Sequence, residues 1–184
     1  MSYVLIEAAN LWEGYCRAFY LSTALRARNH TGRRITLTYS QPIRSLTDAI
    51  TVAVHLNDSS KRTRSGPWTL RDEPTWCNAG FLSKVLRHVG ADNLGEVERA
   101  MGLLPGAMND LRRTRNYFAH KSERSTRSVT GLAREYGFTL PLDPMTLLWS
   151  PAPRRLRPST ADPIIIRWLD VLYRTLRMTC EPVP

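Results

Sequence analysis

The hexapeptide Arg115-Asn116-Tyr117-Phe118-Ala119-His120 lies in a run, Pro105 to Glu123, whose pattern predicts one helix. Steps of three and four residues join five side chains into one stripe along it: Leu104, Met108, Leu111, Arg115 and Phe118. Because an arginine is seldom buried unless it is paired, Arg115 in an otherwise apolar stripe needs an explanation. Asn116 and His120 are four residues apart and share a neighbouring face. The sequence therefore brings a guanidinium, an amide and an imidazole to one patch of one helix.

Helical patterns also occupy most of the chain on either side of this run. We expect further helices over 2–28, 45–56, 74–89, 94–103, 125–137 and 164–179. Their expected boundary residues are Ser45 or Thr47, Pro74, Gly90, and Ser125 or Thr126, with Ser122 to Ser125 as the fraying end of the motif helix. Two β alternatives stay open, a short extended segment at 35–39 and a strand at 50–54. The pattern predicts an all-α fold, an up-and-down bundle of four to five main helices with short additional ones, in a single domain over 1–184.

Two segments have the composition of connections rather than of helices. Residues 57–73 form a polar, basic loop in which Lys61, Arg62 and Arg64 are candidate contacts for RNA phosphates. An ordinary solvated surface loop is the alternative. Residues 150–163 hold four prolines and three arginines, which is typical of a stiff, extended connector.

The composition favours an anionic partner and argues against several classes of site. The net charge is +10 and the pI is about 10.2, which suits binding to nucleic acid. Only three of the 26 basic residues are lysine, however, and a GC-rich genome would produce the same arginine bias. The three cysteines form no CxxC pair or Cys/His cluster, so we predict no metal site, cofactor or disulfide. Without a secretory signal or a long apolar run, the prediction is a reduced, cytoplasmic protein that does not span a membrane.

The Arg115-Asn116-x-x-x-His120 pattern resembles the RX4–6H motif of the HEPN superfamily, in its frequent form with Asn directly after Arg. HEPN domains are small helical bundles, and many are metal-independent ribonucleases that act as dimers in bacterial defence and toxin–antitoxin systems. The resemblance implies an endoribonuclease that is a homodimer, in which two motif helices form one composite cleft with two arginines and two histidines. It also implies a toxin or phage-defence effector that a separate antitoxin or regulatory protein restrains.

By this resemblance, each motif residue has an expected role in cleaving RNA. Arg115 would bind phosphate and stabilise the transition state, His120 would act as general acid and base, and Asn116 would orient the imidazole or bind substrate. Four flanking basic residues would line the RNA path: Arg112, Arg113, Lys121 and Arg124. The structural alternatives are a surface histidine at 120 and an ion-paired arginine at 115.

The sequence departs from one HEPN toxin group at position 122. That group reads Arg-x4-His-x-Tyr, and its tyrosine is the target of a partner nucleotidyltransferase, whereas this chain has Ser122. The departure argues against an antitoxin that acts at this position. Two other functions remain as alternatives, a non-catalytic HEPN-like dimer that binds nucleic acid or a protein partner, and an unrelated helical regulator that binds DNA.

Overall fold

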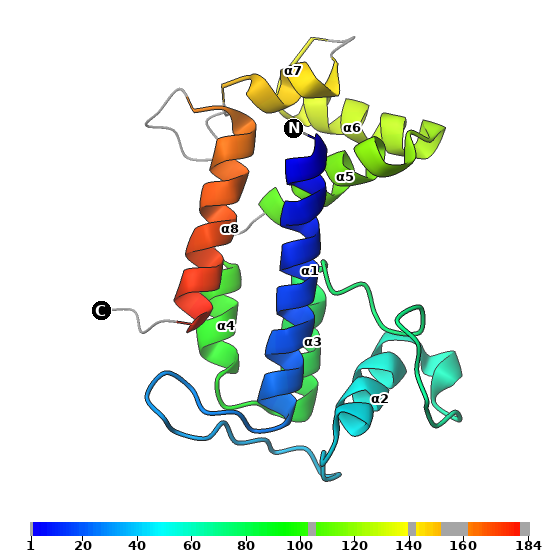
Figure 1. Cartoon of the computed structure of the whole chain (residues 1–184), viewed down its shortest axis with the longest axis vertical. Helices are drawn as coiled ribbons and strands as arrows, with labels where there is room; N and C mark the ends of the chain where they lie inside the picture. Colours follow the sequence, from blue (N-terminus) through cyan, green and yellow to red (C-terminus); the bar gives the residue numbers. More distant parts are fainter. Residues whose placement is uncertain (1, 103–105, 140–142, 152–161, 181–184) are drawn as a thin grey trace. The chain divides into compact units, whose positions relative to one another are not determined.

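The computed structural model describes residues 2–102, 106–139, 143–151 and 162–180. Within these residues, every regular element is a helix (Figure 1). The elements are α1 (Ser2–Ala24), α2 (Leu46–Asn57), the 3-10 turn η1 (Ser59–Lys61), α3 (Ala79–Val89), α4 (Leu94–Met101), α5 (Ala107–His120), α6 (Glu123–Glu135), α7 (Pro144–Trp149) and α8 (Ile164–Cys180). The all-α prediction is confirmed for this described part of the chain.

The chain divides into two compact units, and α1 and α8 each contribute to both. Unit 1 comprises Met1–Trp12 and Leu103–Leu176, and unit 2 comprises Glu13–Gly102 and Arg177–Pro184. The motif helix α5 belongs to unit 1, whereas the basic loop 57–73 belongs to unit 2. The expectation of a single domain over 1–184 stays a prediction.

The core of unit 1 is built around the packing of α5 against α6, which lie side by side in Figure 1. Leu111 of α5 and Leu132 of α6 are buried, as is Trp168 of α8. A buried polar chain links the same three helices. The hydroxyl of Tyr136, directly after α6, donates to Asp110 Oδ2 at 2.7 Å, and Trp168 Nε1 donates to the Tyr136 oxygen at 3.2 Å. These bonds satisfy polar groups that would be costly to bury alone, so they fix where α5 lies in the unit.

Unit 2 is organised by aromatic and polar contacts to the second half of α1. The buried ring of Tyr20 stacks on Trp76 with centroids 5.4 Å apart, and its hydroxyl donates to the carbonyl of Ala49 in α2 at 2.8 Å. Glu73 accepts from Arg17 Nε at 2.7 Å and from Trp76 Nε1 at 2.9 Å. The loop before α3 is therefore anchored to α1 rather than coiled into a helix.

Several predicted boundaries differ from the structure, and each difference has a local cause. Helix α1 ends at Ala24 and not at residue 28, because Arg26 adopts a left-handed conformation with φ 58°. The third helix begins at Ala79 and not at Pro74, since the Asn78 side chain caps it by accepting from Gly80 N at 3.0 Å.

Two further differences concern short elements. Helix α7 was not expected, although Asp143 caps it and Pro144 opens it in the usual way. The strand alternative at 50–54 is wrong, because these residues lie in α2, and the segment 35–39 makes only the isolated bridge between Leu37 and Ala91.

The remaining boundary predictions agree with the structure to within a few residues or lie outside the described residues. Ser45 caps α2 in a reciprocal capping box with Asp48, and Gly90 ends α3 with φ 62°. The fourth helix ends at Met101, before the predicted end at 103, and the last runs over Ile164–Cys180, just beyond the predicted end at 179. The predicted positions of Leu104 and Pro105, and most of the 150–163 connector, fall outside the described residues.

Candidate functional site

Helix α5 places the motif residues just beyond its buried half. The helix follows Gly106, which has φ 87°, and ends at His120 because Lys121 adopts a left-handed conformation with φ 41°. Its buried residues end directly before the motif begins: Ala107, Met108, Asp110, Leu111 and Thr114. The four residues from Arg115 to Phe118 are half-buried and His120 is exposed. The motif therefore lies where the helix passes from the core to the surface.

Arg115 is the most unusual residue of the site, because its charge has no carboxylate partner among the described residues. Its Nη1 donates to Asn116 Oδ1 at 3.2 Å, and its Nη2 lies 3.5 Å from Asn10 Oδ1 of α1, at the limit of a hydrogen bond. Its Nε is buried and has no partner in the described structure. Since none of the described acidic side chains forms an ion pair with Arg115, this half-buried guanidinium retains an uncompensated positive charge. The alternative of a structural, ion-paired arginine finds no partner here.

Asn116 and His120 share a groove of about 450 Å³ between α5 and the start of α6. The residues that line it are Arg112, Arg113, Asn116, His120, Ser122, Arg124, Ser125 and Ser128. The predicted convergence of Asn116 and His120 on one face is therefore confirmed. Arg115 does not line the groove but reaches it through its hydrogen bond to Asn116. Lys121 is exposed and is not among the lining residues.

The two neighbouring arginines of α5, both predicted to contact RNA, have different environments. Arg113 is 17% exposed, donates to both oxygens of Glu135 at 3.0 Å, and bonds the Ser128 carbonyl at 2.7 Å. It also lies 3.7 Å from Asp110. Arg112 is exposed and donates only to Asn109. Because its charge is balanced within the protein, Arg113 has a structural role in joining α5 to α6.

The serines of the groove were not recognised from the sequence as site residues. Ser122 to Ser125 were expected to be a fraying helix end, with Ser125 or Thr126 as the next cap, and both expectations are wrong. Ser122 is the cap of α6: its hydroxyl accepts from Ser125 N at 3.2 Å, and its own N–H donates to the Ser125 hydroxyl at 2.9 Å. A capping box usually has Glu or Gln at its fourth position, so Ser125 gave no signal.

The three candidate basic residues of loop 57–73 lie in unit 2, and each has different contacts. Lys61 pairs with Asp72 at 3.1 Å, and hydrogen bonds from Thr69 and Lys61 hold the pKa of Asp72 well below its ordinary range. The guanidinium of Arg64 lies 5.4 Å from the ring centroid of Trp68, a cation–π contact. Arg62 forms no ion pair or side-chain hydrogen bond with any other described residue. It is therefore the member of this set whose charge is available to a ligand.

The described residues contain no group of three or more His, Cys, Asp or Glu side chains that could hold a metal ion. None of their helices combines the length and the apolar character needed to cross a bilayer.

Comparison with known proteins found no match to a family model, to a curated protein or to a solved structure. The function must therefore be inferred from the chemistry of the site itself.

Proposed function

We propose that this protein is a metal-independent endoribonuclease of the HEPN type, with Arg115, Asn116 and His120 in its active site. The observation that supports this most is the state of Arg115. It is a half-buried guanidinium without a carboxylate partner, hydrogen-bonded to an asparagine that shares a groove with His120. An arginine in this state is suited to an anionic ligand, and a phosphodiester is the anion that a neighbouring histidine can help to cleave.

In the proposed reaction, the 2′-hydroxyl of RNA attacks the adjacent phosphorus. A general base removes the hydroxyl proton as the new P–O bond forms, and a general acid protonates the 5′-oxygen as its bond to phosphorus breaks. The products are a 2′,3′-cyclic phosphate and a 5′-hydroxyl. Imidazole suits both proton transfers, because its unperturbed pKa of about 6.5 lies near working pH. Arg115 would bind the non-bridging oxygens, where charge develops in the transition state.

One histidine cannot be base and acid in the same step, so the proposal includes a homodimer. Two copies of α5 would then supply two imidazoles and two guanidiniums to one composite cleft. Asn116, which already accepts from Arg115, would hold that guanidinium and orient the imidazole.

The groove suggests which flanking residues would contact RNA. Arg124 lines it, is exposed, and makes no ion pair with other described residues. Arg112 lines it and keeps most of its donors available, while Lys121 follows His120 at the end of α5. We assign these three to the RNA path and leave out Arg113. In the cell, such a nuclease would act as a toxin or phage-defence effector under the control of a separate antitoxin or regulator.

The test is cleavage of end-labelled single-stranded, structured and transfer RNA in excess EDTA, with mass analysis of the fragment ends. His120→Ala is compared with His30→Ala, since His30 is an exposed loop residue that does not line the groove. We expect cleavage in EDTA, 2′,3′-cyclic phosphate ends, and a loss of about 100-fold or more in His120→Ala alone.

Activity that needs metal and survives in His120→Ala would exclude this site. No cleavage by folded, dimeric protein would instead favour a non-catalytic HEPN-like dimer.

A further inference from the structure

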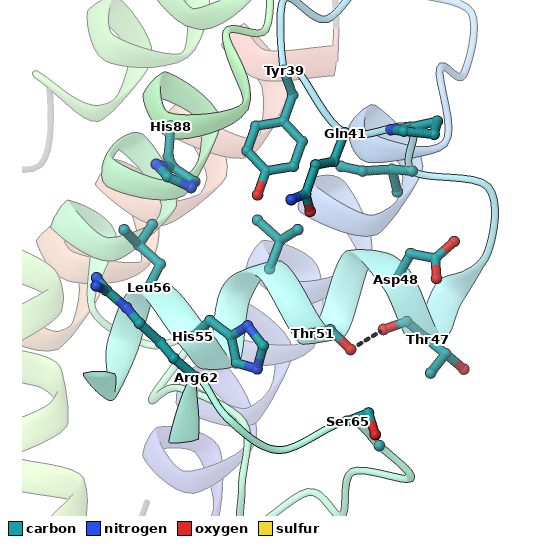
Figure 2. A pocket seen from close by; sticks show the side chains of 14 residues that line it. Tyr39, Gln41, Thr47, Asp48, Thr51, His55, Leu56, Arg62, Ser65 and His88 are labelled. Atoms are coloured by element: carbon teal, nitrogen blue, oxygen red, sulfur yellow. Dashed lines mark hydrogen bonds between the residues drawn. The ribbon is translucent and has the colours of Figure 1, made fainter. Parts of the chain in front are cut away.

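Unit 2 contains a cavity of about 740 Å³ that none of the proposed cleavage residues lines. Four separate segments form its walls: the stretch from Tyr39 to Ile43, one face of α2, the end of α3 at His88, and the loop from Arg62 to Gly66. Figure 2 shows Tyr39 and Gln41 extending over α2 into this space. The lining is mixed, with aromatic rings, hydroxyls and an amide beside aliphatic side chains.

Several polar groups of this cavity have no partner among the described residues. They are the Tyr39 hydroxyl, the Gln41 amide, the Arg62 guanidinium and the His88 imidazole, the last of which meets Tyr39 only through their rings, 5.3 Å apart. In the view of Figure 2, Arg62 and His88 lie toward the end of the cavity marked by Leu56, with Tyr39 between them and Gln41. The unpartnered groups thus run from a guanidinium and an imidazole, past an aromatic ring, to an amide.

Two other polar residues of the lining, Asp48 and Thr51, already form hydrogen bonds within the protein. Asp48 accepts from the N–H groups of Arg44 and Ser45, both at 2.9 Å, in the cap of α2. The hydroxyl of Thr51 donates to the Thr47 carbonyl at 2.8 Å and accepts from Trp68 Nε1 at 2.7 Å. The Asp48 carboxylate is thus engaged by backbone N–H groups, and Figure 2 shows Asp48 toward the end of the cavity opposite Arg62. The groups left for a ligand favour an anion at one end only.

We propose that this cavity binds one nucleotide, base and phosphate together. Arg62 would bind the phosphate through its planar pair of donors, with His88 beside it. The base would stack on the ring of Tyr39, since every base has a face that an aromatic side chain can cover. The Gln41 amide both donates and accepts, which suits the edge of a base. The nucleotide is either free or an unpaired residue of a single strand, and its binding does not depend on the proposed cleavage.

The test is calorimetric titration of the full-length protein at low salt with adenosine and uridine 5′-monophosphates. Inorganic phosphate serves as the anion alone, and a short 2′-O-methyl oligoribonucleotide serves as a strand that cannot be cut by 2′-hydroxyl attack. Arg62→Ala and Tyr39→Ala are compared with Arg71→Ala, which removes the same charge from the same loop but at a residue outside the cavity lining.

We expect a monophosphate or the oligonucleotide to bind, and to bind about tenfold or more weakly to Arg62→Ala and to Tyr39→Ala. Binding to Arg71→Ala should equal that of the wild type. A monophosphate that binds as well as the oligonucleotide identifies a free nucleotide as the ligand, whereas Arg62-dependent binding of the oligonucleotide alone identifies a strand.

Three results would overturn the proposal. The first is that neither the monophosphates nor the oligonucleotide binds. The second is that inorganic phosphate binds with the same affinity as the nucleotides and that Tyr39→Ala leaves nucleotide binding unchanged. The third is an equal loss of binding affinity in Arg62→Ala and Arg71→Ala, which would indicate that the ligand is attracted by net charge only.

Discussion

Replacing Arg113 by alanine should destabilise the protein strongly, whereas the same change at the adjacent Arg112 should not. Arg113 loses a bond to the Ser128 carbonyl at 2.7 Å, two bonds to Glu135 at 3.0 Å, and its proximity of 3.7 Å to Asp110. Arg112 loses one bond to Asn109 at 2.9 Å. Both changes remove one positive charge from the same helix, so the pair separates contacts from charge.

The magnitude can be worked out from these contacts. A charged donor on a part-buried carbonyl contributes about 1.5–3 kcal/mol. The bonds to Glu135, which is 47% exposed, add about 0.5 kcal/mol. Asp110 is left buried with less compensation, at a cost of about 1 kcal/mol. We expect the free energy of unfolding to fall by about 3–4.5 kcal/mol in Arg113→Ala, and by under about 0.5 kcal/mol in Arg112→Ala.

The assay is urea denaturation followed by far-ultraviolet circular dichroism, with a thermal melt as a second measurement. For a chain of this length, the loss in Arg113→Ala corresponds to a fall in Tm of about 6–18 °C. If the two variants unfold within about 0.5 kcal/mol of each other, Arg113 does not join α5 to α6 as described, and it returns to the set of groove residues available to RNA.

Two further predictions concern unit 2. Burial disfavours the charged form of Glu73, but hydrogen bonds from Arg17 and Trp76 outweigh this and hold the pKa of Glu73 below its ordinary value. The stability that Glu73 provides is therefore present above the unfolded pKa of about 4.3 and is lost as the pH falls through the lower folded pKa. Glu73→Gln should lower the free energy of unfolding by about 1–2 kcal/mol at pH 7 and by almost nothing below the folded pKa of Glu73. Urea unfolding of both proteins at pH 7 and below that pKa measures the difference. An equal loss of stability under both conditions would contradict the prediction. Cys180 is exposed, whereas Cys16 is buried and its burial raises the pKa of its thiol well above the usual range. A disulfide reagent should therefore modify Cys180 in the native protein and Cys16 only after unfolding. Cys180→Ser should remove the fast phase, and rapid native modification of Cys16 would contradict its burial.

The sequence was sufficient to predict all the described α-helices except α7, and the side of α5 that carries the motif, because both follow from local spacing. Asn116 and His120 are four residues apart on a regular helix, so their shared groove follows from helical geometry. The different states of Arg112 and Arg113 could not be predicted in this way. They depend on Glu135, which lies 22 residues further along the chain and meets α5 only after α6 has folded back.

The cavity of unit 2, for which we propose nucleotide binding, could be predicted from the sequence even less. Its walls come from four segments between Tyr39 and His88, none of which carries a recognisable motif. The sequence marked Lys61, Arg62 and Arg64 as equivalent basic residues. Only the fold shows that Asp72 and Trp68 engage two of them and leave Arg62 unpaired.

The link between α5 and α6 also determines how the groove could be regulated. Only Lys121 and Ser122 separate the two helices, Ser122 is fixed by its capping box, and Arg113 ties the helices together further along. The two walls of the groove are therefore linked both at the turn and along the helices, and we expect neither to move over the other to cover His120. We therefore expect no autoinhibitory movement within this helix pair. A host that needs to silence the proposed nuclease must cover the groove from outside with another molecule, or prevent two copies from meeting.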